Sequence, residues 1–346
     1  MKALFLAGGN GTRLHPLTES VPKPMVPIMN KPLIERTMVD LKKFGITDIV
    51  ISNCYKPYYM KKYFGDGKKL GLNIQYVVED YPLGTGGAIK NTESHFDDTF
   101  VIFNSDILFD VDIKKMLDFH KSRHALITIA VTEVEDPTVY GVIDVDQMDY
   151  AVSFKEKPKL EDVSSNFINA GIYIFEPEVF RQIPAETVVS LEREVFPKIL
   201  DNGGKIAVYK NGGYWMDIGT PEKYMQAHKD IMNKKGTLFN SYFNKRNVII
   251  GENVSIHPKA VIEGSVFIGD NVKIGANVYI SNSVIGNNVT INPECKVIDS
   301  ILWDDVNIGR DAKLYSTIVL SGSNIARNSV FSKTIITSKE NQSIAI

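Results

Sequence analysis

A loop rich in small residues stands directly behind the first apolar run of the sequence. The stretch LAGGNGTRLHPLTESVPKP covers residues 6 to 24 and combines a glycine cluster with Arg13 and Lys23. Glycines let a backbone approach a ligand with its amide groups turned inward, and the two cations can neutralise phosphate oxygens. The stretch fits neither GxGxxG, because Leu14 occupies the third glycine position, nor the Walker pattern. It indicates a different phosphate loop, with a plain strand-to-helix turn as the alternative.

Two aspartates have the chemistry that a phosphate site requires. Asp106 follows the apolar run TFVIFN, and open α/β sheets bind ligands at the carboxyl ends of their strands. Asp217 stands shortly before Thr220, a candidate N-cap residue. Mg²⁺ is commonly held by one or two carboxylates together with substrate phosphates, so this pair could bind it if the fold brings them together. The alternatives are a strand-ending turn for Asp106 and a helix-start residue for Asp217.

Prolines are frequent around the two cations of the loop. The sequence places them at Pro16, Pro22, Pro24 and Pro27. Proline disfavours helix in its own and the preceding residue. We therefore expect an extended, stiff segment that presents Arg13 and Lys23 at fixed places.

The first two thirds of the chain have the pattern of an α/β domain. Apolar runs of strand length alternate with amphipathic segments up to about residue 232, which predicts a mainly parallel sheet. The expected strands are residues 2–7, 46–52, 99–104, 125–132, 140–146, 151–157 and 167–175. Residues 30–45 are expected to form a helix between the first two strands, and a second helix is expected after Thr220 and Pro221.

A six-residue rhythm replaces the helical pattern after about residue 247. It is carried by Ile250, Ile256, Ile262, Ile268, Ile274 and Ile280. A slower repeat of 17 residues begins at Ser283, Ser300, Thr317 and Thr334. Hexapeptide periodicity predicts a parallel β-helix of about five three-sided coils, whereas a β-sandwich, the alternative, requires a period of two. The expected domains are residues 1–232 and 248–346, with a linker at 233–247.

Composition excludes several classes of partner. The chain of 346 residues has 39 Lys and Arg against 41 Asp and Glu, so no global field attracts nucleic acid or an anionic membrane. Its opening apolar run is too short for a secretory signal, and no later stretch is long enough to span a bilayer. The two cysteines, Cys54 and Cys295, have no partner motif. We expect a cytoplasmic protein with both thiols reduced.

Several motifs together resemble those of the sugar-1-phosphate nucleotidyltransferases. The stretch at 6–24 is similar to that family's signature, and further motifs follow in the family's order. They are PLGTGGAI (82–89), FNSDIL (103–108), FKEKP (154–158), NAGIYIF (169–175) and WMDIGTPEKY (215–224). The resemblance implies a Rossmann-like, GT-A-like catalytic domain followed by a left-handed β-helix of hexapeptide repeats.

The resemblance also assigns roles to individual residues. It implies catalytic roles for Arg13, Lys23 and Asp106, and Mg²⁺ binding by Asp106 and Asp217. The implied nucleotide-binding residues are Leu6, Ala7, Gly8, Gly9, Gly11, Thr12, Arg13, Lys23, Gly84, Thr85 and Gly86. The implied sugar-phosphate residues are Gly141, Glu156, Lys157 and Asn169.

The implied reaction fits the residues that the sequence offers. The phosphate of a sugar 1-phosphate attacks the α-phosphorus of a nucleoside triphosphate and expels pyrophosphate. Because this nucleophile is already an anion, the reaction needs alignment and charge neutralisation rather than a general base. This agrees with a sequence that shows no Ser-His-Asp set and no His or Cys cluster.

The expected substrates are inferred from the sequence of the second glycine loop. PLGTGGAI resembles the loop of guanylyltransferases acting on mannose or heptose phosphates more than that of thymidylyltransferases, which typically carry Gln in this region. We expect GTP and mannose 1-phosphate as substrates and GDP-mannose as product. The alternatives are a glucose-1-phosphate nucleotidyltransferase using dTTP, UTP or ATP, and a heptose-1-phosphate guanylyltransferase.

Two further hypotheses come from other classes. A catalytically silent subunit that senses a nucleotide sugar is disfavoured, because Arg13, Lys23, Asp106, Lys157 and Asp217 are all present. A bifunctional acyltransferase would use His257 as its base, since some hexapeptide β-helices are acyltransferases. We expect a structural role for His257 at a coil corner.

The β-helix predicts self-association. Coils of this kind leave flat faces and unpaired backbone groups at their ends, which a partner or a cap usually covers. We expect residues 248–346 to form a homo-oligomer, so truncation at about residue 240 should lower the oligomeric state and the thermal stability. Turnover should remain in whatever stays folded, because no proposed catalytic residue lies beyond Asp217. Light scattering on both proteins is the test, and a monomeric full-length chain would contradict the prediction.

Overall fold

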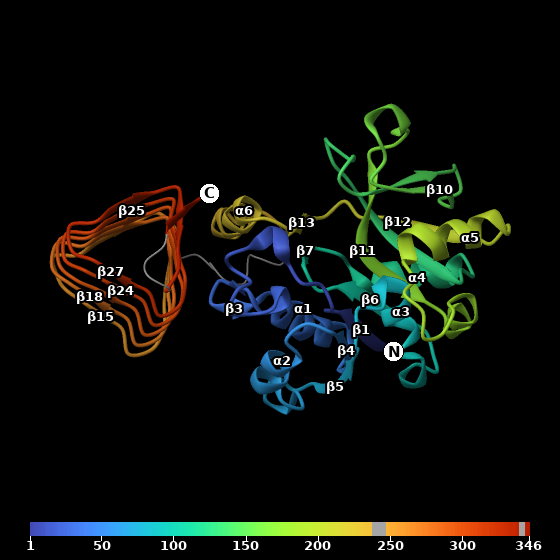
Figure 1. The fold of residues 1–346 in the computed structure, drawn as a ribbon, viewed down its shortest axis with the longest axis horizontal. Coiled ribbons are helices and arrows are strands. Elements are labelled where there is room, and N and C mark those ends of the chain that lie inside the picture. Colours follow the sequence, from blue (N-terminus) through green and yellow to red (C-terminus); the bar gives the residue numbers. More distant parts are fainter. Residues whose placement is uncertain (237–246, 339–342) are drawn as a thin grey trace. The chain divides into compact units, whose positions relative to one another are not determined.

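A computed structural model describes residues 1–236, 247–338 and 343–346, and these form two compact units (Figure 1). The sheet unit consists of Met1–Asn10, Val21–Met25 and Leu33–Trp215. The β-helix unit consists of Gly11–Ser20, Val26–Pro32 and Met216–Ile346. The loop behind the first strand is thus divided, with Arg13 in the β-helix unit and Lys23 in the sheet unit. Most of the expected linker, residues 237–246, lies outside the described residues.

The sheet unit is built on a nine-stranded mixed sheet. Neighbouring strands follow the order β10-β9-β11-β6-β1-β4-β5, and β8 pairs with both β11 and β12. Pairing is parallel along β6-β1-β4-β5 and between β8 and β12, and antiparallel around β9, β10 and β11. The strands are β1 (Lys2–Leu6), β4 (Asp48–Asn53), β5 (Asn73–Val78), β6 (Phe100–Asn104), β8 (Ile127–Glu133), β9 (Gly141–Val145), β10 (Ala151–Glu156), β11 (Phe167–Phe175) and β12 (Ile206–Lys210).

Helices and short strands account for further parts of the described chain before residue 237. The helices are α1 (Leu33–Leu41), α2 (Pro57–Phe64), α3 (Gly84–Lys90), α4 (Ile113–Ser122), α5 (Phe196–Asp201) and α6 (Pro221–Met232). The short strands are β2 (Pro27–Ile28), β3 (Lys31–Pro32), β7 (Ile107–Phe109) and β13 (Trp215–Asp217). All seven strands expected from the sequence are present, with ends shifted by up to two residues. No helix among the described residues has the length and apolar character needed to cross a bilayer.

The expectation of an extended loop around Arg13 and Lys23 is wrong. Thr12–Leu14 and Lys23–Met25 are short 3-10 turns. The backbone angle that proline fixes also suits the tight turns of a 3-10 helix, so these prolines shorten the helical segments without straightening them. Burial of Leu14 and Leu17 gives the turns an apolar anchor.

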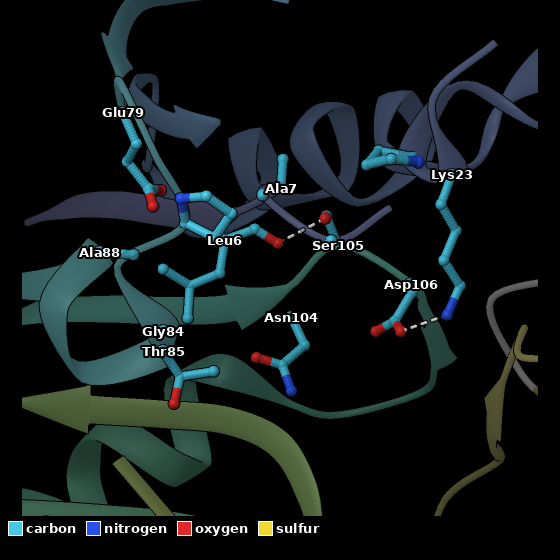
Figure 2. A pocket seen from close by; sticks show the side chains of 14 residues that line it. Leu6, Ala7, Lys23, Glu79, Gly84, Thr85, Ala88, Asn104, Ser105 and Asp106 are labelled. Carbon is cyan, nitrogen blue, oxygen red and sulfur yellow. Dashed lines mark hydrogen bonds and ion pairs between the residues drawn. The ribbon is translucent and has the colours of Figure 1, made fainter. Parts of the chain in front are cut away.

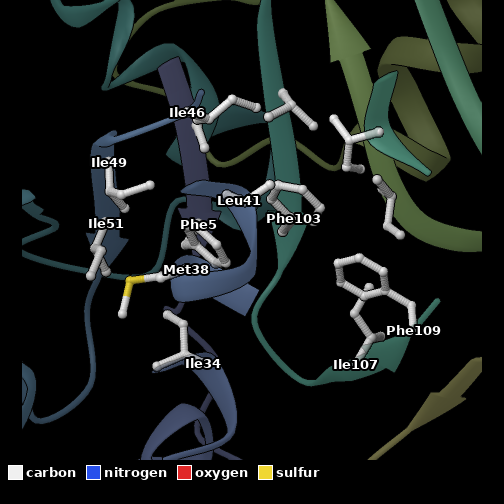
Figure 3. Packing of buried hydrophobic residues seen from close by; sticks show 14 of the residues in the cluster. Phe5, Ile34, Met38, Leu41, Ile46, Ile49, Ile51, Phe103, Ile107 and Phe109 are labelled. Atoms are coloured by element: carbon white, nitrogen blue, oxygen red, sulfur yellow. The ribbon is translucent and has the colours of Figure 1, made fainter. Parts of the chain in front are cut away.

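The sheet is buried on both faces. Successive residues of β1 alternate between two apolar clusters, with Phe5 in one and Leu4 in the other. On the first face, Phe5 stacks on Phe103 of β6 with ring centroids 5.1 Å apart. Figure 3 shows this face covered by α1, whose contributing side chains are Ile34, Met38 and Leu41. The packing on both faces fixes the sheet edge at which β1 and β6 end.

The second unit contains a parallel β-helix with three stacks of short strands. The first stack is β14 (Val248–Ile250), β17 (Val266–Ile268), β20 (Val284–Ile285), β23 (Ile301–Leu302), β26 (Ile318–Val319) and β29 (Thr334–Ile336), followed by the antiparallel β30 (Ser343–Ala345). The second is β15 (Ser255–Ile256), β18 (Lys273–Ile274), β21 (Thr290–Ile291), β24 (Asn307–Ile308) and β27 (Asn324–Ile325). The third is β16 (Val261–Glu263), β19 (Tyr279–Ser281), β22 (Lys296–Ile298), β25 (Lys313–Tyr315) and β28 (Val330–Ser332).

The strand register explains the 17-residue repeat. Partners are 18 residues apart in the first coil, as in Val248 with Val266, and 17 apart later, as in Val284 with Ile301. The corner that is one residue shorter lies between the third stack and the first, and it contains a column of buried hydroxyl residues, Ser283, Ser300 and Thr317. The Ser300 amide donates to Ser283 Oγ, and the Thr317 amide donates to Ser300 Oγ, both at 3.1 Å. Each coil is therefore tied to the next through its interior.

Helix α6 belongs to the β-helix unit through buried hydrogen bonds. The indole Nε1 of Trp303 donates to the hydroxyl of Tyr224 at 2.9 Å, and that hydroxyl donates to the carbonyl of Pro27 at 2.7 Å. Tyr224 is fully buried and Trp303 is 4% exposed. Asn30 Nδ2 donates to the carbonyl of Ile285 at 2.8 Å. These bonds hold α6 and the segment Val26–Pro32 against the coils.

His228 is buried in the same contact as a neutral ring. Its Nε2 accepts a hydrogen bond from the Met29 amide at 3.2 Å, and Nδ1 lies 3.0 Å from the Tyr224 carbonyl oxygen, to which it can donate. Burial lowers the pKa of His228 to about 4. A proton on Nε2 would displace the Met29 amide, so the neutral form is the one that the packing requires.

The buried histidine predicts acid sensitivity. Because the folded-state pKa lies below the unfolded value, His228 favours folding above about pH 6.5 and loses that contribution as pH falls toward 4, by about 3 kcal/mol in full. His228→Gln should flatten the fall in urea-unfolding free energy between pH 7 and pH 4.5. His257→Gln, at an exposed position, is the control. Burial also lowers the pKa of His120, so some acid sensitivity should remain, and an unchanged slope in His228→Gln would contradict the prediction.

Candidate active site

A pocket of about 320 Å³ opens in the sheet unit where β1 and β6 end (Figure 2). The residues that line it come from the first glycine loop, the second glycine loop and the segment after β6. They are Leu6, Ala7, Gly8, Gly9, Lys23, Pro24, Glu79, Pro82, Gly84, Thr85, Ala88, Asn104, Ser105 and Asp106. Its volume suits a small-molecule ligand. Gly86 lies next to the lining residues in α3, while Gly11, Thr12 and Arg13 belong to the β-helix unit.

One end of this pocket carries an ion pair. Lys23 Nζ lies 2.5 Å from Asp106 Oδ2, and the two side chains are 11% and 35% exposed. The segment after β6 is fixed to β1, because Ser105 Oγ donates to the Leu6 carbonyl at 2.5 Å. Figure 2 shows the Lys23–Asp106 pair at one side and the Ser105–Leu6 hydrogen bond nearer the middle of the view. A cation and a carboxylate are therefore held together within reach of a phosphate ligand.

The glycines of the two loops serve different purposes. A side chain at Gly9 would meet no atom within 4 Å, so this loop is open to a ligand. Gly84 has a φ of +73°, and a Cβ there would lie 2.6 Å from the Val189 carbonyl oxygen. The amides of Gly86 and Gly87 donate to that same oxygen at 3.0 and 3.2 Å. Internal packing against Val189 thus requires glycine in the second loop, whatever ligand it binds.

The structure brings together the residues assigned to the sugar phosphate. Glu156 of β10 pairs with Gly141 of β9, and Lys157 Nζ lies 3.7 Å from Glu156 Oε1. Burial raises the pKa of the Glu156 carboxyl and the charge of Glu192 raises it further, while Lys157 and Arg193 oppose the shift. A carboxyl in this environment gains from hydrogen bonds with ligand hydroxyl groups.

A buried tyrosine connects this region to other polar side chains. Asn169 Nδ2 donates to the Tyr173 hydroxyl at 2.8 Å. Burial is the main cause that raises the pKa of Tyr173, and Asn104 and Asn169, which both hydrogen-bond its hydroxyl, oppose the shift. Glu192 accepts a hydrogen bond from Thr85 Oγ1 at 2.6 Å, which joins the second glycine loop to the Glu156 region.

Three residues that sequence reasoning missed stand out at this site: Glu79, Asn104 and Glu192. Asn104 had a usable signal, since it lies two residues before Asp106 at the end of β6. Glu79 and Glu192 had none, because both occur in segments where the spacing of charged residues is ordinary.

The second candidate metal ligand lies in the β-helix unit. Asp217 Oδ1 forms an ion pair with Lys223 Nζ, and the Asp217 side chain is 14% exposed. Asp106 and Asp217 thus each form an ion pair with a lysine ammonium, and a metal cation could bind the same carboxylate in its place. Among the residues that the structure describes, no group of three or more His, Cys, Asp or Glu side chains could hold a metal by itself. Single hard carboxylates fit Mg²⁺ that is completed by phosphate oxygens and water.

His257 is exposed at a corner of the first coil. Its Nδ1 accepts a hydrogen bond from the Lys259 amide at 3.1 Å. A histidine engaged in this way stabilises the turn and has only Nε2 left for other partners. This arrangement favours the structural interpretation over an acyltransferase base.

The chain belongs to the nucleotidyltransferase family, whose profile, described as nucleotidyl transferase, matches residues 2–234. A second profile, described as the EIF2B subunit epsilon LbH domain, matches residues 245–342. The predicted fold is therefore confirmed as a nucleotidyltransferase domain followed by a left-handed β-helix. Family members use nucleoside triphosphates and sugar 1-phosphates and generally require a divalent metal.

Individual relatives are similar over most of their length. The mannose-1-phosphate guanylyltransferase of Mycobacterium tuberculosis is 38% identical over 285 residues, covering 82% of this chain and 79% of the relative. The UTP–glucose-1-phosphate uridylyltransferase of a Synechocystis species is 34% identical over 297 residues, covering 81% and 76%. The crystal structure of HddC from Yersinia pseudotuberculosis superposes with a TM-score of 0.57 at 32% identity, covering 65% of this chain and 97% of HddC. The predicted nucleotidyltransferase class is thereby confirmed.

Replacing the two aspartates tests their assignment as metal ligands. Asp106→Asn and Asp217→Asn keep the side-chain shape but remove the charge that would hold Mg²⁺. We expect each to lower Mg²⁺-dependent turnover by about a hundredfold or more, with the thermal midpoint nearly unchanged. Asp110→Asn is a control that lies outside the pocket lining. Near-normal rates in both site variants would show that the assignment is wrong.

Proposed function

We propose that this protein transfers a guanylyl group from GTP to mannose 1-phosphate, giving GDP-mannose and pyrophosphate. The mannose-1-phosphate guanylyltransferases of Mycobacterium tuberculosis and of Hypocrea jecorina, 38% and 37% identical, support this choice within the family. The second support comes from the chemistry of the pocket, which contains one buried carboxylate far from the Lys23–Asp106 pair.

Glu79 is the observation that carries the preference for guanine. Its side chain is 5% exposed, and Figure 2 shows it at the opposite end of the pocket from Lys23 and Asp106. Ser52 Oγ and the Leu83 amide donate to its two oxygens at 3.0 and 3.1 Å, which fixes the carboxylate and leaves each oxygen a further lone pair.

A fixed carboxylate discriminates between bases by their hydrogen-bonding edges. Guanine offers two adjacent donors, N1–H and the exocyclic amine, which a carboxylate can accept together. Uracil and thymine offer one N–H between two carbonyl oxygens that a carboxylate repels. Adenine offers its amine beside a ring acceptor. Guanine is therefore the base with which Glu79 makes the most favourable contact.

The remaining residues perform the transfer by positioning and neutralisation. A sugar-phosphate oxygen attacks the α-phosphorus, the new P–O bond forms, and the bond to the β-phosphate bridging oxygen breaks as pyrophosphate leaves. Lys23 and Arg13 neutralise phosphate charge, Lys157 binds the sugar phosphate, and Glu156 accepts hydrogen bonds from sugar hydroxyls. Bound Mg²⁺, held by Asp106 and Asp217 together with phosphate oxygens, would stabilise charge that develops on the triphosphate.

Uridylyl transfer to glucose 1-phosphate is the second candidate, since one similar relative is a UTP–glucose-1-phosphate uridylyltransferase. A panel of GTP, UTP, dTTP and ATP against mannose, glucose and heptose 1-phosphates decides between the candidates by pyrophosphate release. GTP with mannose 1-phosphate should give the highest kcat/KM. A higher value for another pair would overturn the substrate assignment, and no release with any pair would favour the sensing-subunit hypothesis.

Glu79→Gln should relax the choice of base. The glutamine amide accepts hydrogen bonds through its oxygen only, and its NH₂ group would face one of the two donors of guanine. The kcat/KM for GTP should therefore fall by about tenfold or more relative to that for UTP. Asp80→Asn is the matched control, because this neighbouring acid is exposed. An unchanged ratio of GTP to UTP in Glu79→Gln would remove Glu79 from base recognition.

A further inference from the structure

Lys223, at the start of α6, is a charged residue to which the proposed reaction gives no role. Lys223 Nζ contacts Asp217 Oδ1, and the lysine side chain is 35% exposed. Its backbone is fixed in the first turn of the helix, where the Lys223 amide donates to Thr220 Oγ1 at 3.4 Å. The ammonium of Lys223 therefore contacts the carboxylate that is assigned to the metal. The long side chain of the lysine can change conformation, while its backbone is held by the hydrogen bond to Thr220.

Arg13 faces the same space within the β-helix unit. Gly219 separates Asp217 from the helix, and a Cβ at position 219 would lie 2.7 Å from Asp217 Oδ2 and 3.9 Å from Arg13 Nη2. One oxygen of Asp217 thus contacts Lys223, while the other oxygen and the Arg13 guanidinium both lie close to Gly219, where a side chain would collide with the carboxylate. These groups lie just before the amino end of a 12-residue helix, where the helix dipole favours anions.

A divalent cation bound at Asp217 would compete with Lys223 for the same carboxylate. A doubly charged hard cation interacts more strongly with the Asp217 oxygens than an ammonium does, and two cations on one carboxylate repel each other. Lysine is a mobile point charge that can move to a new anion, and phosphate oxygens are the anions that this family binds. Displacement of Lys223 would leave two cations, Lys223 and Arg13, beside the amino end of α6.

We propose that Lys223 is a further phosphate-binding residue of this enzyme. It neutralises Asp217 in the metal-free protein and binds the triphosphate beside Arg13 once a divalent cation takes that carboxylate. The inference rests on the proposed function for the triphosphate substrate, but it does not depend on which base or sugar is used.

The test separates metal binding from nucleotide binding. Mn²⁺ binding to the protein alone is measured by electron paramagnetic resonance, and GTP affinity by the KM in saturating Mg²⁺. Lys223→Met should tighten Mn²⁺ binding by about threefold or more, because the competing charge is gone, and raise the KM for GTP by about tenfold. Lys223→Arg, which keeps a cation, should recover most of the GTP affinity. Lys229→Met, on the same helix, should change neither quantity.

The opposite signs of the two effects make the proposal falsifiable. If Lys223 only braces the helix start, Lys223→Met should weaken Mn²⁺ binding or leave it unchanged, and this overturns the competition. An unchanged KM for GTP overturns the phosphate contact. Thermal midpoints of the variants show whether the fold is retained, and Lys223→Gln, which also removes the charge but keeps a polar side chain, carries the test with the same two expected signs if Lys223→Met unfolds. A wild type that prefers another triphosphate overturns the GTP assignment alone, because the Mn²⁺ measurement contains no nucleotide.

Discussion

The parallel pairing of β1 with β6 and β4 is the constraint on which the pocket depends. It places Leu6 opposite Asn104 on one side and Ser52 on the other, so three chain segments end at one edge of the sheet. At this edge the Ser105 hydroxyl donates a hydrogen bond to the Leu6 carbonyl, and the Ser52 hydroxyl donates one to the Glu79 carboxylate. Because both faces of the sheet are packed, this edge cannot shift without opening a core. The hydrogen bonds of the polar end groups thus start from strand ends that the apolar packing holds in place.

Neutralisation by neighbouring groups is the second organising theme. In the sheet unit Lys23 neutralises Asp106, and in the β-helix unit Lys223 neutralises Asp217. A partly buried charge without a partner is costly, so each carboxylate needs a cation before substrates arrive. The same cations are the groups that phosphates require. A site organised in this way needs no general base, which agrees with the nucleophile's existing charge.

Periodic features of this fold could be predicted from the sequence, and contacts between distant residues could not. The isoleucine rhythm and the strand pattern identified both folds, because a repeating backbone geometry imposes a repeating side-chain order. The role proposed for Glu79 depends on β5 lying beside β4, which nothing in the local sequence VVEDY reveals. The same is true of the Tyr224–Trp303 hydrogen bond, which joins residues 79 positions apart. The turns around Arg13 were mispredicted because proline restricts φ without deciding between extended and 3-10 backbone.

The buried hydroxyl column of the β-helix makes the domain modular in length. Since Ser283, Ser300 and Thr317 occupy equivalent places in successive coils, inserting or deleting one whole 17-residue coil among them would re-form the same bonds between the remaining neighbours. A gain or loss that is not a whole number of coils would put the wrong residues in the interior column. Evolution can therefore lengthen or shorten such a domain only in whole coils, and each step changes the outer faces while preserving the core.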